Sequence, residues 1–214
     1  MKYLYLCLLL VSGLLSGCQS ADEASRSTYI LIDISGTYFK QLDSCVRATK
    51  YALVKLKPSD FIAVAKISSK SFSNREVIVK GKLPRQPSQA NAMKTRMGAA
   101  IDKFAKSARA TSYTDISGAM YQAAQVLHNQ PSHQKRLIIF SDLVEDLSLD
   151  VIRERLPDLQ GIDVIATNVI KLRADNRNPE NYFKRLQTWQ ELILGAGAKS
   201  WKVVDDPMQL ASYL

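Results

Sequence analysis

Apolar residues follow two alternating patterns along this chain from residue 28 onward. Short runs of consecutive apolar residues are typical of buried β-strands, whereas apolar residues three and four apart are typical of one face of a helix. The runs predict strands at 29–34, 60–68, 76–80, 136–141, 162–170 and 201–204. The stripes predict helices at 39–56, 93–108, 116–127, 149–156, 179–194 and 207–213.

This alternation predicts an α/β domain with a three-layer, doubly wound and mostly parallel sheet, because βαβ units cover both faces of the sheet that they build. Residues 76–80 alternate in polarity and follow the preceding strand closely. We therefore expect one antiparallel edge strand there, joined by a hairpin through Ser73 and Asn74. Ligands of such sheets gather at the carboxyl ends of the central strands, where the strand order reverses. The chemistry of the domain is expected at that edge.

The first eighteen residues carry the pattern of a secretory signal. Lys2 precedes an apolar run from Tyr3 to Leu15, and the segment closes on Leu-Ser-Gly-Cys at Cys18. A basic start, a short apolar run and small residues at a cleavage point are the parts of a signal peptide. The run is shorter than the roughly 20 residues that a membrane-spanning helix needs. We expect the mature protein to lie outside the cytoplasm.

The Leu-Ser-Gly-Cys ending resembles the lipobox of bacterial lipoproteins. The resemblance implies that residues 1–17 are removed, that Cys18 is acylated with palmitate-type chains, and that residues 18–27 tether a domain of residues 28–214. Ordinary secretion and an uncleaved anchor are the alternatives. Gln19 stands where an aspartate would resemble an inner-membrane retention signal. This favours the periplasmic face of the outer membrane over the inner membrane.

Charge and cysteine content narrow the partners further. The formal net charge of +9 would elsewhere suggest nucleic acid. Secretion excludes nucleic acid, so we expect anionic lipid headgroups or acidic protein partners, with simple solubility as the alternative. With Cys7 removed and Cys18 lipidated, Cys45 has no partner for an internal disulfide, and we interpret it as a small buried hydrophobic residue. His128 and His133 are interpreted as surface residues.

Three sequence segments with short oxygen side chains are expected at the carboxyl edge of the sheet. They are the end of the first strand, the start of the third helix and the Ser-Asp pair after the fourth strand, and they carry Asp33, Ser35, Thr37, Thr114 and Asp142. A compact cluster of such hard oxygens without histidine or cysteine suits Mg²⁺, with Mn²⁺ or Ca²⁺ as alternatives. Two carboxylates roughly balance a divalent ion and leave a coordination position for the carboxylate of a partner.

The order Asp33-x-Ser35-x-Thr37, then Thr114, then Asp142 resembles the metal-ion-dependent adhesion site (MIDAS) of the von Willebrand factor type A (VWFA) domain. The resemblance implies that the three hydroxyl residues contact the metal directly and that the two aspartates act partly through water. The family more often has serine where this chain has Thr37. The hydroxyl is kept, but the added methyl group brings bulk to the site.

The same residues allow an interpretation without a metal. The three hydroxyl side chains also fit as helix N-caps, each contributing about 1 kcal/mol, while the two carboxylates hold loop amides. The neighbouring acidic residues Asp115, Glu145 and Asp146 are assigned to helix-start and solvated-surface roles.

These observations predict a metal-dependent module that binds an acidic group on a protein partner in the cell envelope, with no catalysis and no small-molecule substrate. One alternative is a metal-independent scaffold with the same fold, which would use a helix face or the charged segment 173–185. The other is a phosphatase, because residues 33–37 distantly resemble the Asp-x-Asp-Gly-Thr motif of haloacid-dehalogenase-type enzymes. Ser35 replaces the second aspartate of that motif and is a poor general acid at neutral pH.

Overall fold

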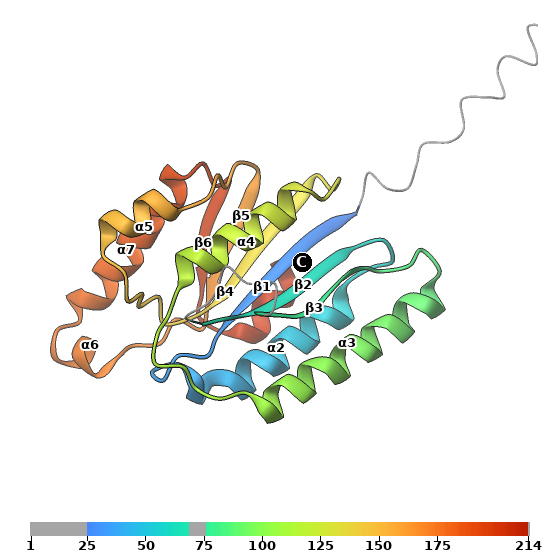
Figure 1. Cartoon of the computed structure of the whole chain (residues 1–214), viewed down its shortest axis with the longest axis horizontal. Coiled ribbons are helices and arrows are strands. Elements are labelled where there is room, and N and C mark those ends of the chain that lie inside the picture. The colour runs from blue at the N-terminus through green and yellow to red at the C-terminus, as the bar shows by residue number, and fades with distance from the viewer. Residues whose placement is uncertain (1–24, 69–75, 214) are drawn as a thin grey trace, which may run out of the picture.

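The computed structural model describes residues 25–68 and 76–213, in which strands and helices alternate along the chain (Figure 1). The strands are β1 (Arg26–Asp33), β2 (Phe61–Ile67), β3 (Val77–Lys82), β4 (Gln134–Phe140), β5 (Ile162–Thr167) and β6 (Ser200–Val204). The helices are η3 (Phe39–Gln41), α2 (Leu42–Lys55), α3 (Pro87–Ser107), α4 (Ile116–His128), α5 (Leu149–Arg155), α6 (Arg173–Arg177), α7 (Glu180–Gly195) and η5 (Pro207–Tyr213).

The strands form one sheet in the order β3-β2-β1-β4-β5-β6. Neighbouring strands are parallel, except that β2 pairs with β3 in antiparallel fashion at one edge. The chain runs outward from β1 to β3, returns to β4 beside β1, and then runs outward on the other side. The strand order therefore reverses between β1 and β4, and the predicted fold class is confirmed.

Alternate residues of β1 divide the core into two layers. Tyr29 and Leu31 pack with α4, α5 and α7 on one face of the sheet. Ile30 and Ile32 pack with α2, α3 and η5 on the other face. Figure 1 shows α4, α5 and α7 on one side of the sheet and α2 and α3 on the other. Because both faces of this central strand are buried, its sequence is a continuous apolar run rather than an alternating one.

The first strand begins earlier than the sequence predicts. Residues 26 and 27, which the sequence analysis placed in the tether, belong to β1. The backbone N–H of Arg26 donates to Asp60 Oδ1 at 2.9 Å, and the Ser132 hydroxyl donates to Ser27 Oγ at 2.6 Å. These two contacts hold the start of β1 in the sheet.

Other elements also differ from the prediction. Helix α3 starts at Pro87, inside the predicted loop, because a proline fits the first helical position. Strand β5 ends at Thr167, and the last helix is a 3₁₀-helix. The charged segment 173–185 contains the short helix α6 and the start of α7, and the buried Asp175 of α6 pairs with Arg185 at 2.8 Å.

Cys45 is a fully buried free thiol, and His128 and His133 are exposed, as expected. Residues 73 and 74 of the predicted hairpin, and Cys18 with the leader, lie outside the described residues. Within the described residues, no helix combines the length and apolar character needed to cross a bilayer.

Candidate functional site

Asp33 is the last residue of β1 and is fully buried at the carboxyl edge of the sheet. Its Oδ1 accepts a hydrogen bond from the Ser35 backbone N–H at 2.7 Å, and its Oδ2 accepts one from the Ser141 hydroxyl at 2.7 Å. Ser141 directly follows β4. The carboxylate is therefore held by residues at the ends of both β1 and β4, the two strands between which the strand order reverses. The sequence pattern predicts no role for Ser141, although its place between β4 and Asp142 is a usable signal.

The turn after β1 brings two of the predicted hydroxyl ligands together. Ser35 Oγ and Thr37 Oγ1 lie 3.3 Å apart. Ser35 is buried and Thr37 is exposed, so one residue of the pair lies in the interior and the other at the surface. The turn is closed by the N–H groups of Tyr38 and Phe39, which donate to the Ser35 carbonyl at 3.0 and 2.8 Å.

Asp142 is fully buried in the segment that follows β4. Its Oδ1 accepts a hydrogen bond from the Val144 N–H at 3.0 Å. Its Oδ2 is buried and has no hydrogen-bond partner among the described residues. A buried polar atom without a partner destabilises a fold by about 1–3 kcal/mol, and by more when it is charged. This oxygen therefore lacks the positive charge or donor that its burial requires.

Thr114 is buried in a loop that joins the other two segments. In this loop, the Thr111 N–H donates to the Ile34 carbonyl at 2.9 Å, and the Gly36 N–H donates to the Thr111 carbonyl at 2.9 Å. The Thr114 N–H donates to Asp146 Oδ2 at 2.7 Å. The loop before α4 thus runs between the turn after β1 and the segment after β4, as the sequence predicts.

The helix-cap alternative fails for the three predicted hydroxyl ligands. The N-cap of η3 is Tyr38, which makes no side-chain cap hydrogen bond. The N-cap of α4 is Asp115, whose Oδ1 accepts from the Gly118 N–H at 2.9 Å. The alternative also predicts that the two carboxylates hold loop amides. Each carboxylate does so with one oxygen, because Oδ1 of Asp33 and Oδ1 of Asp142 accept hydrogen bonds from loop N–H groups.

The electrostatics of the site call for positive charge. Burial raises the pKa of Asp33 to about 6; hydrogen bonds from Ser141 and Ser35 lower it, and the negative charge of Asp142 raises it. The two carboxylates are therefore close enough to repel each other in a region shielded from water. A cation between them would lower the free energy of both charged groups.

The residues present fit a hard divalent ion. Among the described residues, no group of three or more His, Cys, Asp or Glu side chains is arranged to hold a metal. Any coordination at this edge therefore depends on hydroxyl oxygens in addition to two carboxylates. Asp142 Oδ2, which has no partner among the described residues, and the neighbouring pair of hydroxyls on Ser35 and Thr37 offer only oxygen donors, which are the kind that Mg²⁺ prefers.

A second charged group holds the N-terminus of α4 beside this site. Glu145 accepts from the Ser117 hydroxyl at 2.6 Å and from the Ser117 N–H at 3.2 and 3.3 Å. Asp115 pairs with Arg155 of α5 at 3.1 Å. Burial raises the pKa of Glu145 to about 7, while the Ser117 hydrogen bonds lower it. Glu145 and Asp115 therefore both hold the start of α4, as the helix-start assignment predicts, and Glu145 is partly buried rather than fully solvated.

No protein-family model matches the sequence, and no curated protein matches it. Solved structures share its fold. A von Willebrand factor type A protein from Catenulispora acidiphila superposes with a TM-score of 0.56 at 16% identity, over 88% of this chain and 41% of that chain. The pilus adhesin SpaC from Lactobacillus rhamnosus GG has a TM-score of 0.56 at 14% identity, over 91% of this chain and 29% of that chain.

A third structure matches this chain over almost its own full length. An aerotolerance-related membrane protein from Bacteroides fragilis has a TM-score of 0.56 at 13% identity, over 88% of this chain and 96% of that chain. This chain spans less than half the length of the first two proteins. At these identities the likeness concerns the fold. The chain has the fold of von Willebrand factor type A domains, as its sequence motif implies.

Proposed function

We propose that this protein is a membrane-anchored, divalent-metal-dependent protein-binding module of the bacterial envelope. The observation that carries the proposal is the buried Oδ2 of Asp142, which has no hydrogen-bond partner among the described residues and lies near a second buried carboxylate, Asp33. A divalent cation, Mg²⁺ first and Mn²⁺ or Ca²⁺ as alternatives, would balance these two charges. Ser35, Thr37 and Thr114 would contribute neutral hydroxyl oxygens.

The metal, when bound, supplies a Lewis-acidic position that can accept an oxygen ligand from outside the protein. The residues of the chain set the geometry of that position. Ser141 and the Ser35 N–H hold both oxygens of Asp33, which leaves Asp33 to act through water. Thr37 is exposed and places its hydroxyl where a partner can approach. A partner's carboxylate is the ligand that suits the remaining charge.

The fold neighbours are compatible with this role. One is described as a pilus adhesin and another as a membrane protein. Adhesion is a protein-binding activity at the cell surface, and the signal-like start of this chain supports a role outside the cytoplasm. No reaction is proposed, because Ser35 occupies the position that a phosphatase of the haloacid-dehalogenase type would need for its general acid.

Metal binding can be tested by the thermal unfolding of the purified protein with Mg²⁺ or Mn²⁺ and with a chelator. We expect a higher unfolding temperature with metal, and no such rise in Asp142→Asn. Asp150→Asn is the matched control, because the side chain of Asp150 is 89% exposed on α5 and removes the same charge. An unchanged unfolding temperature at millimolar metal in the wild type would favour the metal-independent scaffold instead.

The membrane anchor is proposed at Cys18, after removal of residues 1–17 and before a short tether. Radioactive palmitate given to cells should label the wild-type protein but not Cys18→Ser, and the variant should be found in the soluble fraction. Membrane retention of the unlabelled variant would contradict the anchor. Separation of inner and outer membranes would then test the expected location at the periplasmic face of the outer membrane.

A further inference from the structure

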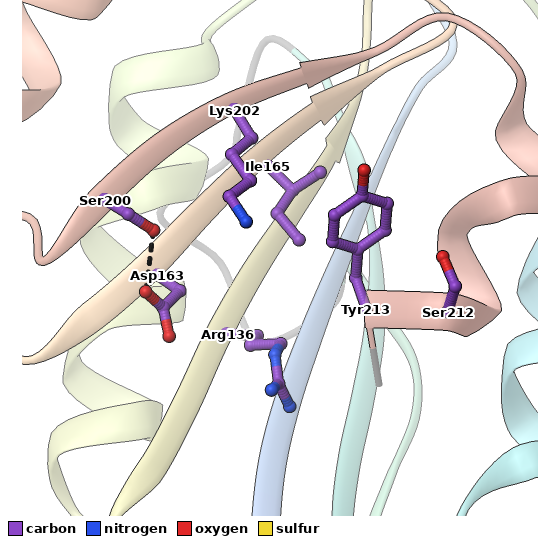
Figure 2. A pocket seen from close by; sticks show the side chains of 7 residues that line it. All are labelled: Arg136, Asp163, Ile165, Ser200, Lys202, Ser212 and Tyr213. Carbon is purple, nitrogen blue, oxygen red and sulfur yellow. Dashed lines mark hydrogen bonds between the residues drawn. The ribbon is translucent and has the colours of Figure 1, made fainter.

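A pocket of about 250 Å³ lies at the amino-terminal half of β4, β5 and β6, away from the carboxyl edge that carries the candidate metal site. Arg136, Asp163 and Ser200 lie side by side across these three parallel strands. The next row on the same face holds Ile165 and Lys202, which are also paired across the strands. The 3₁₀-helix η5 contributes Ser212 and Tyr213. Figure 2 shows the residues that line the pocket, with Ile165 between Lys202 and Tyr213.

The guanidinium of Arg136 lacks a full set of partners. Its Nη1 is buried and has no hydrogen-bond partner among the described residues. Burial lowers the pKa of Arg136, the charges of Asp163 and Asp60 raise it, and that of Arg26 lowers it. Asp60 already accepts hydrogen bonds from Arg26 at 2.9 and 3.4 Å. The positive charge of Arg136 is therefore only partly compensated.

Asp163 supplies the one carboxylate among the described residues that line the pocket, and this carboxylate is also engaged. Asp163 Oδ1 accepts from the Ser200 hydroxyl at 2.6 Å, which Figure 2 draws as a dashed line, and its Oδ2 lies 4.0 Å from Lys199 Nζ. Lys202 Nζ stands 5.2 Å from the centre of the Tyr213 ring. Two cations and one occupied carboxylate line the pocket, so its walls carry a net positive charge.

We propose that this pocket binds a carboxylate carried on a small apolar or aromatic body. A guanidinium presents a planar fork that matches the two oxygens of a carboxylate, and Lys202 adds a second positive charge to the pocket. One negative charge balances the net charge of the walls. Ile165 and the ring of Tyr213 supply apolar contact for the body. The volume lies below the roughly 300–1,000 Å³ of pockets for drug-sized ligands, which limits the body to about one ring or side chain.

This ligand chemistry has two sources, a free small acid or the C-terminal residue of a peptide. Benzoate is the probe for the first, and an N-acetylated tripeptide ending in phenylalanine is the probe for the second. Each is titrated into the full-length protein by isothermal calorimetry, with benzamide as the neutral analogue of benzoate. We expect at least one of the two acids to bind. If the free acid is the ligand, benzamide should bind at least tenfold more weakly than benzoate.

Variants that remove one positive charge test whether the acid binds in this pocket. Arg136→Gln and Lys202→Gln should each weaken the binding of the acid about tenfold. Arg153→Gln is the matched control, because this arginine is 62% exposed on α5 and its loss lowers the net charge equally. If Arg136→Gln fails to fold, Lys202→Gln decides, since Lys202 is exposed. No binding of either acid at tens of millimolar, equal binding of benzamide, or equal weakening in Arg153→Gln would overturn the proposal.

Discussion

The hydroxyl of Ser141 donates a hydrogen bond of 2.7 Å to Oδ2 of Asp33 and thereby joins the carboxyl ends of β4 and β1. Ser141 Oγ in turn accepts from the Leu143 N–H at 2.9 Å, which fixes its position. Asp33 therefore cannot change its orientation without disturbing the segment that carries Asp142. The two buried carboxylates of the candidate site behave as one unit across the strand reversal.

Ser141→Ala should lower both stability and metal affinity. The substitution removes the donor to Asp33 Oδ2 and leaves a buried carboxylate oxygen unsatisfied, which costs about 1–3 kcal/mol. Chemical denaturation in chelator gives the loss of stability, and metal titration gives the loss of affinity.

Ser132→Ala is the matched control for this prediction. Ser132 lies just before β4 and donates a buried hydrogen bond to Ser27 Oγ of β1 at 2.6 Å. This bond also joins the two strands, but at the end opposite to Ser141. Ser132→Ala should lower stability while metal affinity stays unchanged. Equal losses of affinity in the two variants would show that Ser141 acts through general stability alone.

Asp142→Asn should stabilise the protein when no metal is present. The substitution removes a buried, unpaired negative charge and its repulsion of Asp33. The gain should be on the order of 1 kcal/mol in chelator, because a buried polar atom without a partner destabilises a fold by about 1–3 kcal/mol. Urea unfolding in excess chelator measures it. A variant less stable than the wild type under these conditions would mean that Asp142 Oδ2 is satisfied in solution.

Gly118→Ala should destabilise the start of α4. A Cβ at this position would lie 2.5 Å from Oδ2 of Asp115, so the carboxylate that caps the helix and pairs with Arg155 would have to move. Loss of an N-cap costs about 1 kcal/mol. Gly98→Ala in α3 meets nothing within 4 Å and should gain up to about 1 kcal/mol from helix propensity. Thermal unfolding of both variants measures the difference, and equal stabilities would contradict the capping role.

Glu145 should make stability depend on pH. Burial raises its pKa from the usual 4.5 to about 7 in the folded state. Between these values the folded protein holds a proton at Glu145 that the unfolded chain releases, so this residue makes stability fall as pH rises through the window. Glu145→Gln removes the effect.

The test for Glu145 is a comparison across pH in the presence of chelator. The stability of Glu145→Gln minus that of the wild type should rise by on the order of 1–3 kcal/mol between pH 4.5 and pH 7, and then level off. Denaturant unfolding at half-unit steps of pH measures this difference. A flat difference across the window would mean that Glu145 is as solvated in the folded state as in the unfolded chain.

The periodicity of apolar residues was sufficient to predict the layers of this protein. The continuous apolar run at the start of the domain could only be a strand buried on both faces, and the stripes between strands required helices on both sides of a parallel sheet. The expected meeting of Asp33 and Asp142 at one edge followed from the same logic, because each residue lies at the end of a central strand.

The sequence by itself determined which residue types lie at the carboxyl edge of the sheet, because strand ends and helix starts are local features of the chain. Only the tertiary structure decided how the polar atoms there are paired: Ser141 with Asp33, Glu145 with Ser117, and Asp142 Oδ2 with none of the described residues. The pocket around Arg136 and Lys202 likewise depended on strand register and on the position of η5. Hydrogen bonds between residues far apart in the sequence depend on register and packing to within an ångström, and residue spacing carries no such information.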